Sequence, residues 1–255
     1  MPFEHFCGYK IMNQFSRTEL LFGKEAIEKF NKTRVAIMGL GGVGSFAAEA
    51  LARSGIGAFL LVDFDKVSLS NLNRQSQALH STIGKMKTEA MKERILNINP
   101  DAKVDIYSDF CAIESREFLL KNVDFVVDAI DSLGPKSGLL EAVYKKKIPV
   151  ISVLGAASRF DPSKIELCDI SKSRICPLAK KVRKYLHRRG ITEGIPVIYS
   201  YEKPIAQFAH ETGAEAEWIS GRGRKRGTLG SVVYLPAIMG MWAASYVLRK
   251  LAGII

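Results

Sequence analysis

Short apolar runs alternate with longer stretches of helical periodicity in the first part of the chain. Residues 34–39 (RVAIMG) and 58–63 (AFLLVD) are two such runs, and an alanine-rich stretch separates them. Two further runs, at 123–130 and 148–153, flank a helix-like stretch over 135–147. Continuous apolar runs are typical of strands buried on both faces, and strand–helix–strand crossovers are right-handed. The pattern predicts a doubly wound, Rossmann-like α/β fold with a mostly parallel sheet.

The pattern changes in the second part of the chain, residues 156–255. Strand candidates at 164–170 and 195–201 enclose a basic segment, and an apolar stretch occupies 229–248. No linker rich in Pro, Gly and Ser separates this part from residues 1–155, which include an N-terminal helical arm. We therefore expect one integrated domain, in which the second part continues the same sheet as a C-terminal extension.

The apolar stretch at 229–248 is long enough to span a bilayer, which takes about 20 residues. Pro236 and Gly240 interrupt it, and basic residues flank both ends without the asymmetry that orients a membrane span. We expect a helix that is buried or lies in an oligomer interface. Peripheral membrane contact is the less favoured alternative.

The composition fits a globular cytoplasmic protein with a polyanionic partner. Apolar residues make up 47% of the chain and charged residues 25%, which excludes a disordered or fibrous protein. Lysine and arginine number 37 against 26 acidic residues, so the net charge of +11 favours binding of polyanions. None of the four cysteines shows Cys-x-x-Cys spacing, and the start of the chain lacks a secretory signal.

A glycine motif follows the first predicted strand. Gly39, Gly41 and Gly44 form a Gly-x-Gly-x-x-Gly pattern that ends a strand and opens a helix. Such glycines permit a tight turn and close approach of phosphate to the helix N-terminus. Asp63 ends the next strand, where an acid accepts hydrogen bonds from a ribose. The motif predicts a nucleotide site; the alternative is a tight strand-to-helix connection without a ligand.

Residue types that bind phosphate follow downstream. Asn71 and Arg74 lie in one segment, and a helix-like stretch over 84–98 starts with Lys85 and Lys87. Lysine in a first helical turn opposes the helix dipole by about 0.3–1 kcal/mol, and a bound triphosphate would reverse that effect. The alternative is that both lysines are ordinary solvated residues.

Four motifs in this order resemble the superfamily of ubiquitin-activating enzymes and of the molybdopterin- and thiazole-biosynthesis adenylyltransferases. The motifs are GLGGVGS at 39–45, VDFDKVSLSNLNRQ at 62–75, GKMKTEA at 84–90 and DAID at 128–131. The resemblance implies that ATP binds under the glycine turn. It also implies that a substrate carboxylate attacks the α-phosphate, giving an acyl adenylate and pyrophosphate.

The resemblance implies roles for individual residues. The implied catalytic residues are Arg17, Arg74, Lys87 and Asp131. The implied contacts with ATP come from Gly39, Gly41, Gly42, Gly44, Asp63, Asp65, Asn71, Arg74 and Lys87. Asp63 and Asp65 would hold the ribose, and Asp131 would bind Mg²⁺. Arg17, in SRTELLFG, would reach into the site of a neighbouring subunit, which implies a homodimer.

Two aspartates of the DAID motif have simpler interpretations. An acid such as Asp131 at the end of a buried strand can cap the next helix, so its metal role depends on the other motifs. Asp128 lies within the predicted strand and faces either the core or the crevice, so we assign it no role.

Further segments resemble one branch of the superfamily, the tRNA threonylcarbamoyladenosine dehydratases. The segments are SRTELLFGKEAIEKF (16–30), AEALARSGIG (48–57), RILNINP (94–100), DAIDSLGPKSGLL (128–140) and CPLAKKVRKYL (176–186). This branch activates the threonyl carboxylate of the modified adenosine with ATP, and internal attack closes an oxazolone ring as AMP leaves. Because the nucleophile is internal, the resemblance assigns no role to the cysteines.

Two basic runs support an RNA partner independently of the resemblance. Residues 172–189 hold eight basic residues and no acid, and 221–227 (GRGRKRG) hold four more. Such clusters are typical of surfaces that bind a phosphate backbone, whereas a single run is more often a solvated face. The expected RNA-binding residues are Lys180, Lys181, Arg183, Lys184, Arg188, Arg189, Arg222, Arg224, Lys225 and Arg226.

The favoured hypothesis is an ATP- and Mg²⁺-dependent dehydratase of tRNA, with a sulfur-transfer protein as a further candidate partner. An adenylyltransferase for the C-terminus of a sulfur-carrier protein is the alternative, weakened by the missing Cys-x-x-Cys pairs. A nicotinamide oxidoreductase or a nucleotide-sensing module needs only the glycine turn and Asp63. That interpretation leaves Arg74, Lys87 and Asp131 without a role.

Overall fold

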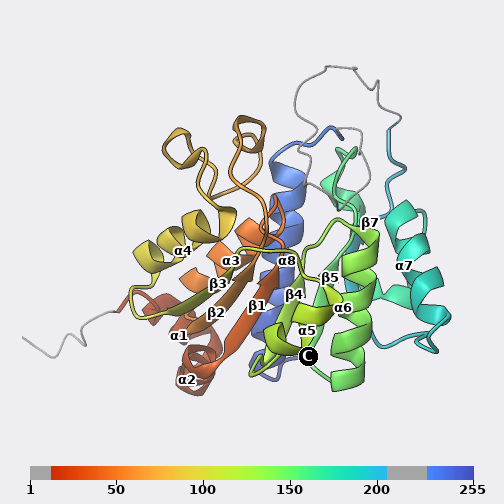
Figure 1. Cartoon of the computed structure of the whole chain (residues 1–255). Coiled ribbons are helices and arrows are strands. Elements are labelled where there is room, and N and C mark those ends of the chain that lie inside the picture. The colour runs from red at the N-terminus through yellow and green to blue at the C-terminus, as the bar shows by residue number, and fades with distance from the viewer. Residues whose placement is uncertain (1–12, 206–228) are drawn as a thin grey trace, which may run out of the picture.

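A seven-stranded sheet forms the centre of the computed structural model, which describes residues 13–205 and 229–255 (Figure 1). The strand order is β3-β2-β1-β4-β5-β7-β6, and only the β6–β7 pair is antiparallel. The strands are β1 (Arg34–Met38), β2 (Ala58–Val62), β3 (Lys103–Tyr107), β4 (Phe125–Asp128), β5 (Val150–Val153), β6 (Ile165–Asp169) and β7 (Pro196–Ser200). This arrangement confirms the predicted doubly wound, mostly parallel α/β fold.

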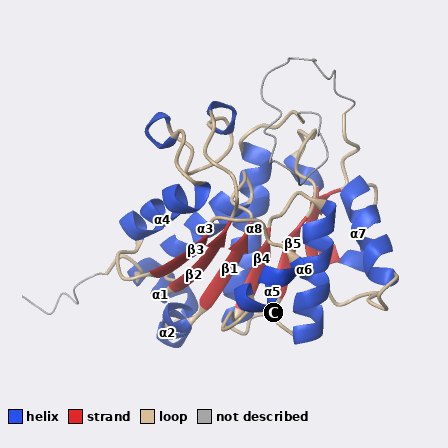
Figure 2. Cartoon of the chain, viewed as in Figure 1, coloured by secondary structure: helices blue, strands red, loops and turns tan. Residues whose placement is uncertain are grey.

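Helices cover both faces of the sheet (Figure 2). They are α1 (Ser16–Phe22), α2 (Lys24–Lys32), α3 (Gly44–Arg53), α4 (Lys87–Ile98), α5 (Ile113–Leu119), α6 (Leu133–Lys146), α7 (Pro177–His187) and α8 (Tyr234–Leu251). Side chains of α2, α3, α4 and α8 share one apolar core, and those of α5, α6 and α7 share the other. The sheet is thus the middle of three layers.

Strand β1 shows why the apolar runs are continuous. Val35 and Ile37 belong to the core under α3 and α8, whereas Ala36 and Met38 belong to the core under α6. Successive side chains of a strand point to opposite faces, so a strand covered on both sides needs an apolar residue at every position. Four of the five residues of β1 are buried.

The predicted strands are present, and two elements were missed. The candidates at 164–170 and 195–201 form β6 and β7, which extend the same sheet beyond β5. Strand β3 and helix α5 were not predicted. Strand β3 lies at the sheet edge with the burial pattern of a half-exposed strand, and α5 is a short helix that exposes Phe118.

Helix α8 packs against α3 and β5, and it begins five residues later than the apolar stretch that predicted it. A Cβ on Gly240 would lie 2.4 Å from the carbonyl oxygen of Val43, so this glycine allows the helix to contact the start of α3 closely. Leu235, Met239 and Ala243 are buried, which confirms the expected burial. In the two described ranges, no helix has the length and apolar character needed to cross a membrane.

A buried carboxylate joins α3 to α4. Glu49 accepts hydrogen bonds at 2.6 Å from Nε of Arg94 and at 2.8 Å from Nη2 of Arg53. Burial disfavours the charged carboxylate, but the bonds from the two arginines outweigh burial and lower the pKa of Glu49. The ionised form of Glu49 therefore stabilises the folded state.

We expect Glu49→Gln to lower the free energy of unfolding by about 1 kcal/mol near neutral pH, because charge-assisted hydrogen bonds are weakened. Since the folded pKa is lowered, this contribution is complete above the unfolded value of 4.5 and disappears as the pH falls through the folded pKa. Urea unfolding of both proteins near neutral pH and at about pH 3 measures the difference. An equal difference at both pH values would contradict the role of the ionised carboxylate.

Candidate nucleotide site

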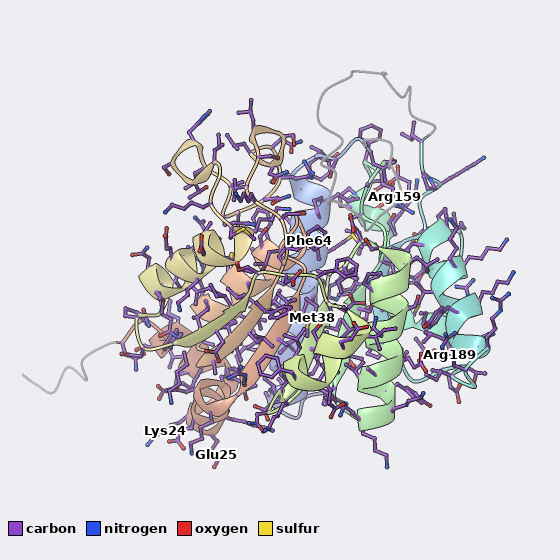
Figure 3. All side chains as sticks on the ribbon, viewed as in Figure 1. Lys24, Glu25, Met38, Phe64, Arg159 and Arg189 are labelled. Atoms are coloured by element: carbon purple, nitrogen blue, oxygen red, sulfur yellow. The ribbon has the colours of Figure 1, made fainter. Side chains whose placement is uncertain are left out.

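The carboxyl ends of β1, β2 and β4 meet at the upper edge of the sheet in Figure 1. The chain leaves β1 toward β2 on one side, and β4 lies on the other side, so the loops diverge at this point. Ligands of open α/β sheets bind at such a switch point. Figure 3 marks the region by Met38, the last residue of β1, and by Phe64, next to Asp63.

The glycine turn is held together by contacts that exclude side chains. Gly39 has a φ of +94°, and its N–H donates to the carbonyl oxygen of Val62 at 2.8 Å. A Cβ on Gly44 would lie 1.8 Å from the carbonyl oxygen of Gly39, and one on Gly42 would lie 3.0 Å from that of Arg74. Gly44 must be glycine because a backbone atom occupies the space of its Cβ, Gly39 is favoured by its positive φ, and at Gly42 a Cβ would fit only tightly.

Gly41 differs from the other glycines of the turn. Among residues 13–205 and 229–255, no atom lies within 4 Å of a Cβ built on it, and its φ does not lie in the left-handed region. The protein's own packing therefore does not require glycine here. Open space beside a backbone that leads into the N-terminus of α3 suits a phosphate group.

The carboxylate of Asp63 ties the end of β2 to the glycine turn. Its Oδ2 accepts a hydrogen bond from the N–H of Leu40 at 2.6 Å, and its Oδ1 accepts one from the N–H of Asp65 at 2.9 Å. Burial raises the pKa of Asp63, while the positive charge of Lys87 acts in the opposite direction. A carboxylate has about four acceptor positions, so these two bonds leave acceptors for ribose hydroxyls.

Lys87 forms an ion pair with Asp65. The distance from Nζ to Oδ2 is 2.6 Å, and the lysine side chain is only 7% exposed. Helix α4 begins at Lys87, so Lys85 precedes the helix and pairs with Glu93 at 2.9 Å. The expectation that both lysines lie in the first helical turn was therefore wrong for Lys85, and the charge of Lys87 is balanced by Asp65.

Asn71 and Arg74 belong to a segment packed on the glycine turn. Asn71 is buried, and its Oδ1 accepts a hydrogen bond from the N–H of Ser68 at 3.2 Å. Nη1 of Arg74 donates to the carbonyl oxygen of Ser70 at 2.7 Å and to Oδ1 of Asn73 at 2.8 Å. Burial lowers the pKa of Arg74. Arginine has five N–H donors, so those on its other nitrogens remain for a phosphate.

Asp131 lies beyond the end of β4, on the turn that contacts Gly39. A Cβ on Gly39 would lie 2.9 Å from the carbonyl oxygen of Ala129, and the N–H of Ala129 donates to the carbonyl oxygen of Met38 at 2.8 Å. Asp131 is exposed, and its Oδ1 accepts a hydrogen bond from Oγ of Ser132 at 3.2 Å. The N-cap of α6 is Ser132, so Asp131 does not occupy the capping position.

One carboxylate beside a phosphate site fits Mg²⁺, which retains waters and is usually held by one or two carboxylates together with substrate phosphates. In the ranges 13–205 and 229–255, no group of three or more His, Cys, Asp or Glu side chains could hold a metal ion.

A buried polar cluster under this turn was not predicted. Asp128, Lys136 and Ser152 are each 0% exposed, and Nζ of Lys136 lies 2.6 Å from Oδ2 of Asp128. Sequence analysis left Asp128 without a role and did not single out Lys136. A lysine among the apolar residues of GPKSGLL is the one signal that the sequence offers.

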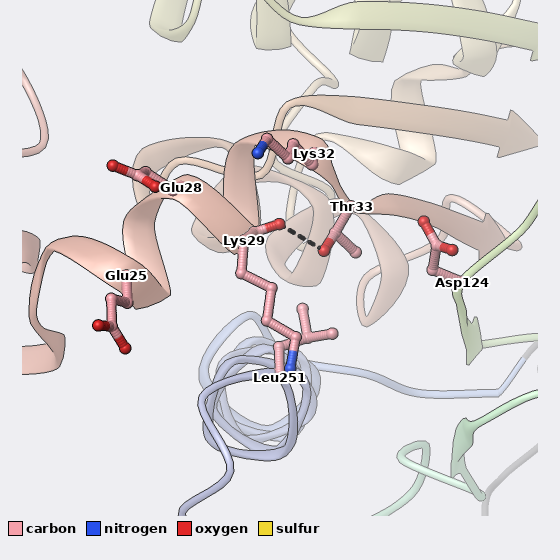
Figure 4. A pocket seen from close by; sticks show the side chains of 7 residues that line it. All are labelled: Glu25, Glu28, Lys29, Lys32, Thr33, Asp124 and Leu251. Carbon is pink, nitrogen blue, oxygen red and sulfur yellow. Dashed lines mark hydrogen bonds between the residues drawn. The ribbon is translucent and has the colours of Figure 1, made fainter.

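A cavity of about 480 Å³ lies at the amino ends of the strands, near the start of β1 (Figure 4). Glu25, Glu28, Lys29 and Lys32 line it together with Thr33, Asp124 and Leu251. It contains none of the predicted site residues.

The structure divides the predicted RNA-binding residues of α7. Arg183 donates to the carbonyl oxygen and to Oγ of Ser173. Arg189, labelled in Figure 3, forms an ion pair with Glu141 at 2.7 Å and stacks on the ring of Tyr185 at 3.5 Å. Both arginines therefore hold α7 to its neighbours.

Lys180, Lys181 and Lys184 of α7 are exposed, as are Arg188 and Arg189 after its end, Arg189 despite its ion pair. Arg222, Arg224, Lys225 and Arg226 lie outside the described residues. Arg17 is exposed on α1.

A sequence model of the ThiF family matches residues 15–255. The chain is 47% identical over 196 residues to the tRNA threonylcarbamoyladenosine dehydratase of Bacillus subtilis, covering 76% of this chain and 77% of that one. It is 34% identical over 250 residues to the Escherichia coli protein of the same name, covering 93% of each.

The fold is also similar to that of a solved structure. Escherichia coli tRNA N6-threonylcarbamoyladenosine dehydratase in complex with ATP matches with a TM-score of 0.83 and 33% identity, covering 94% of each chain. The molybdopterin-synthase adenylyltransferase of Escherichia coli is 33% identical over 152 residues, which is 59% of this chain.

We expect Gly44→Ala to destabilise the fold by about 3 kcal/mol, because its Cβ would require a backbone shift at Gly39. Gly41→Ala is the matched control and should change stability by less than about 1 kcal/mol. Its effect should fall on binding, as a loss of the thermal stabilisation produced by a nucleoside triphosphate. Thermal unfolding with and without the nucleotide measures both effects; equal melting temperatures of the two apo variants would contradict the difference.

Proposed function

Because the chain belongs to the ThiF family, we propose that it is an ATP-dependent tRNA threonylcarbamoyladenosine dehydratase. The observation that carries this proposal is the arrangement around the open space at Gly41. Contacts from the glycine turn reach Asp63, the segment of Arg74 and the turn of Asp131. The Escherichia coli relative of that name matches 93% of the chain.

The chemistry begins with a carboxylate and ATP. A threonyl carboxylate oxygen of the modified adenosine forms a bond to the α-phosphorus, and the bond from that phosphorus to the bridging oxygen of pyrophosphate breaks. An internal oxygen of the threonylcarbamoyl group then attacks the acyl carbon, and AMP leaves with the former carboxylate oxygen. The nucleoside loses one proton and closes its oxazolone ring, for a net loss of one water.

We propose that this chain binds ATP, orients its ribose and phosphates, and neutralises the negative charge that develops at the phosphorus. In-line displacement at phosphorus spreads negative charge over non-bridging oxygens, and pre-positioned cations stabilise that charge better than mobile water does. Arg74 and Lys87 are the proposed cations, and Asp65 holds the lysine in place by its ion pair. Asp63 holds the ribose. Asp131 is the proposed ligand of Mg²⁺, which when bound neutralises phosphate charge.

The exposed surface of α1 supports a further proposal, that Arg17 acts in the site of a second copy. No residue of α1 is buried, and Leu20 and Leu21 are 88% and 79% exposed. Large exposed apolar side chains in one place are typical of interaction surfaces. A homodimer would cover them and bring Arg17 against a neighbouring subunit.

The exposed basic residues of α7 are proposed to bind the tRNA backbone. Ala179, Val182 and Leu186 form the buried side of the helix, so Lys180, Lys181, Lys184 and Arg188 extend from the other side. Phosphate contacts orient a nucleic acid without reading its sequence.

The sulfur-carrier alternative rests on weaker support. The adenylyltransferase relative matches 59% of this chain, against 93% for the Escherichia coli dehydratase. A match of that length is consistent with shared ATP chemistry. A sulfur-transfer partner remains a proposal without a described surface.

Incubation of tRNA that carries threonylcarbamoyladenosine with the protein, ATP and Mg²⁺ should convert that nucleoside to a product lighter by one water, as measured by mass spectrometry of the nucleosides. Asp131→Ala and Arg74→Ala should each reduce the rate by about 10²–10³-fold, because charge in the transition state loses a partner. Asp101→Ala, an exposed acid between α4 and β3, is the control. Normal turnover in both site variants would contradict the assigned roles.

We expect Lys181→Ala with Lys184→Ala to weaken tRNA binding and to reduce the slope of log Kd against log salt concentration by about 2. The rate at saturating tRNA should stay unchanged. The control is Lys29→Ala with Lys32→Ala on α2. This pair also removes two positive charges, but beside the cavity near the start of β1. Equal effects of the two pairs would mean that net charge, and not α7, determines binding.

A further inference from the structure

Three buried polar side chains lie together between β4, β5 and α6. Asp128, Lys136 and Ser152 are completely inaccessible to solvent. Nζ of Lys136 donates to Oδ2 of Asp128 at 2.6 Å and to Oγ of Ser152 at 3.2 Å. Oγ of Ser152 donates to the same Oδ2 at 2.7 Å. One oxygen of the Asp128 carboxylate thus has two donors within the cluster.

The second carboxylate oxygen holds the backbone of the site. Oδ1 of Asp128 accepts a hydrogen bond from the N–H of Ile130 at 3.1 Å. That amide immediately precedes Asp131 and would lie 3.2 Å from a Cβ on Gly39. The carboxylate of Asp128 therefore connects the buried Lys136 to the turn after β4. This turn carries Asp131 and contacts the glycine turn.

Stability alone does not account for such a cluster. Removing two charges from water costs several kcal/mol per ion, and replacing a buried ion pair with apolar residues is often neutral or stabilising. Burial also lowers the pKa of Lys136, against which the charges of Asp128 and Asp131 act. The retained lysine must therefore be explained by what it orients.

We infer that Lys136 is a positioning residue for adenylation, which acts through Asp128 to fix the Ile130 amide and thereby hold Asp131 against the glycine turn. The inference rests on the proposed function for its catalytic consequence. Its structural part, the fixing of the Ile130 amide, can be measured without any substrate. Ser152 is the second support of the same carboxylate.

The test uses Lys136→Met in the full chain, because methionine is similar in length and carries no charge. We expect the Ile130 amide to exchange with deuterium at least tenfold faster, while amides of β5 keep their protection. We also expect kcat for dehydration to fall at least tenfold, with the Kd for tRNA unchanged. Unchanged exchange at Ile130, or wild-type kcat, would overturn the inference.

Ser152→Ala covers the case in which Lys136→Met does not fold, since it keeps the ion pair and removes one hydrogen bond to Asp128. It should show the same pattern with a smaller decrease of kcat, about threefold to tenfold. Loss of activity in proportion to a lower melting temperature, with Ile130 still protected, would indicate a merely structural role and overturn the inference. If the wild-type chain leaves the nucleoside unchanged, the proposed function fails, and exchange at Ile130 still tests Lys136.

Discussion

The nucleotide site depends on glycines at which the backbones of neighbouring elements approach each other closely. The carbonyl oxygen of Gly39 lies 1.8 Å from the place of a Cβ on Gly44, and the carbonyl oxygen of Ala129 lies 2.9 Å from the place of a Cβ on Gly39. These contacts join β1, α3 and the turn after β4 through close backbone approach. Helix α8 approaches the same place through Gly240. Any side chain at these points would separate the elements that carry the chemistry.

Two carboxylates stabilise the junction from opposite sides, Asp63 at intermediate exposure and Asp128 fully buried. Asp63 accepts the N–H of Leu40 on the glycine turn, and Asp128 accepts the N–H of Ile130 on the neighbouring turn. Each carboxylate has a lysine associated with it, Lys87 near Asp63 and Lys136 beside Asp128. Buried acceptors of this kind specify backbone positions, since an unpaired carboxylate in the interior is costly. The geometry of the nucleotide site therefore also depends on side chains, such as Asp128 and Lys136, that hold the backbone and are not proposed to contact a ligand.

Continuous apolar runs were sufficient to predict six of the seven strands and the mostly parallel direction of the sheet, whereas the nucleotide site at the glycine motif stays a prediction. Strand β3 and helix α5 were missed because edge elements are half exposed and lack such runs. Lys136 of α6 is buried against Asp128 of β4 and Ser152 of β5, so its burial depends on contacts between three elements and no local pattern contains it. On α7, the basic run does not separate Arg183 and Arg189, which support the fold, from the exposed lysines.

The open edge of the sheet at β3 has a consequence for behaviour at high concentration. An edge strand offers unpaired peptide groups to the strands of other molecules, and charged side chains along it oppose such pairing. Lys103 and Asp105 are exposed on β3, and Asp105 is held by Arg34 at 2.8 Å. Charges at these positions oppose edge-to-edge pairing at β3, whereas the strand at the other edge of the sheet, β6, runs antiparallel to its neighbour.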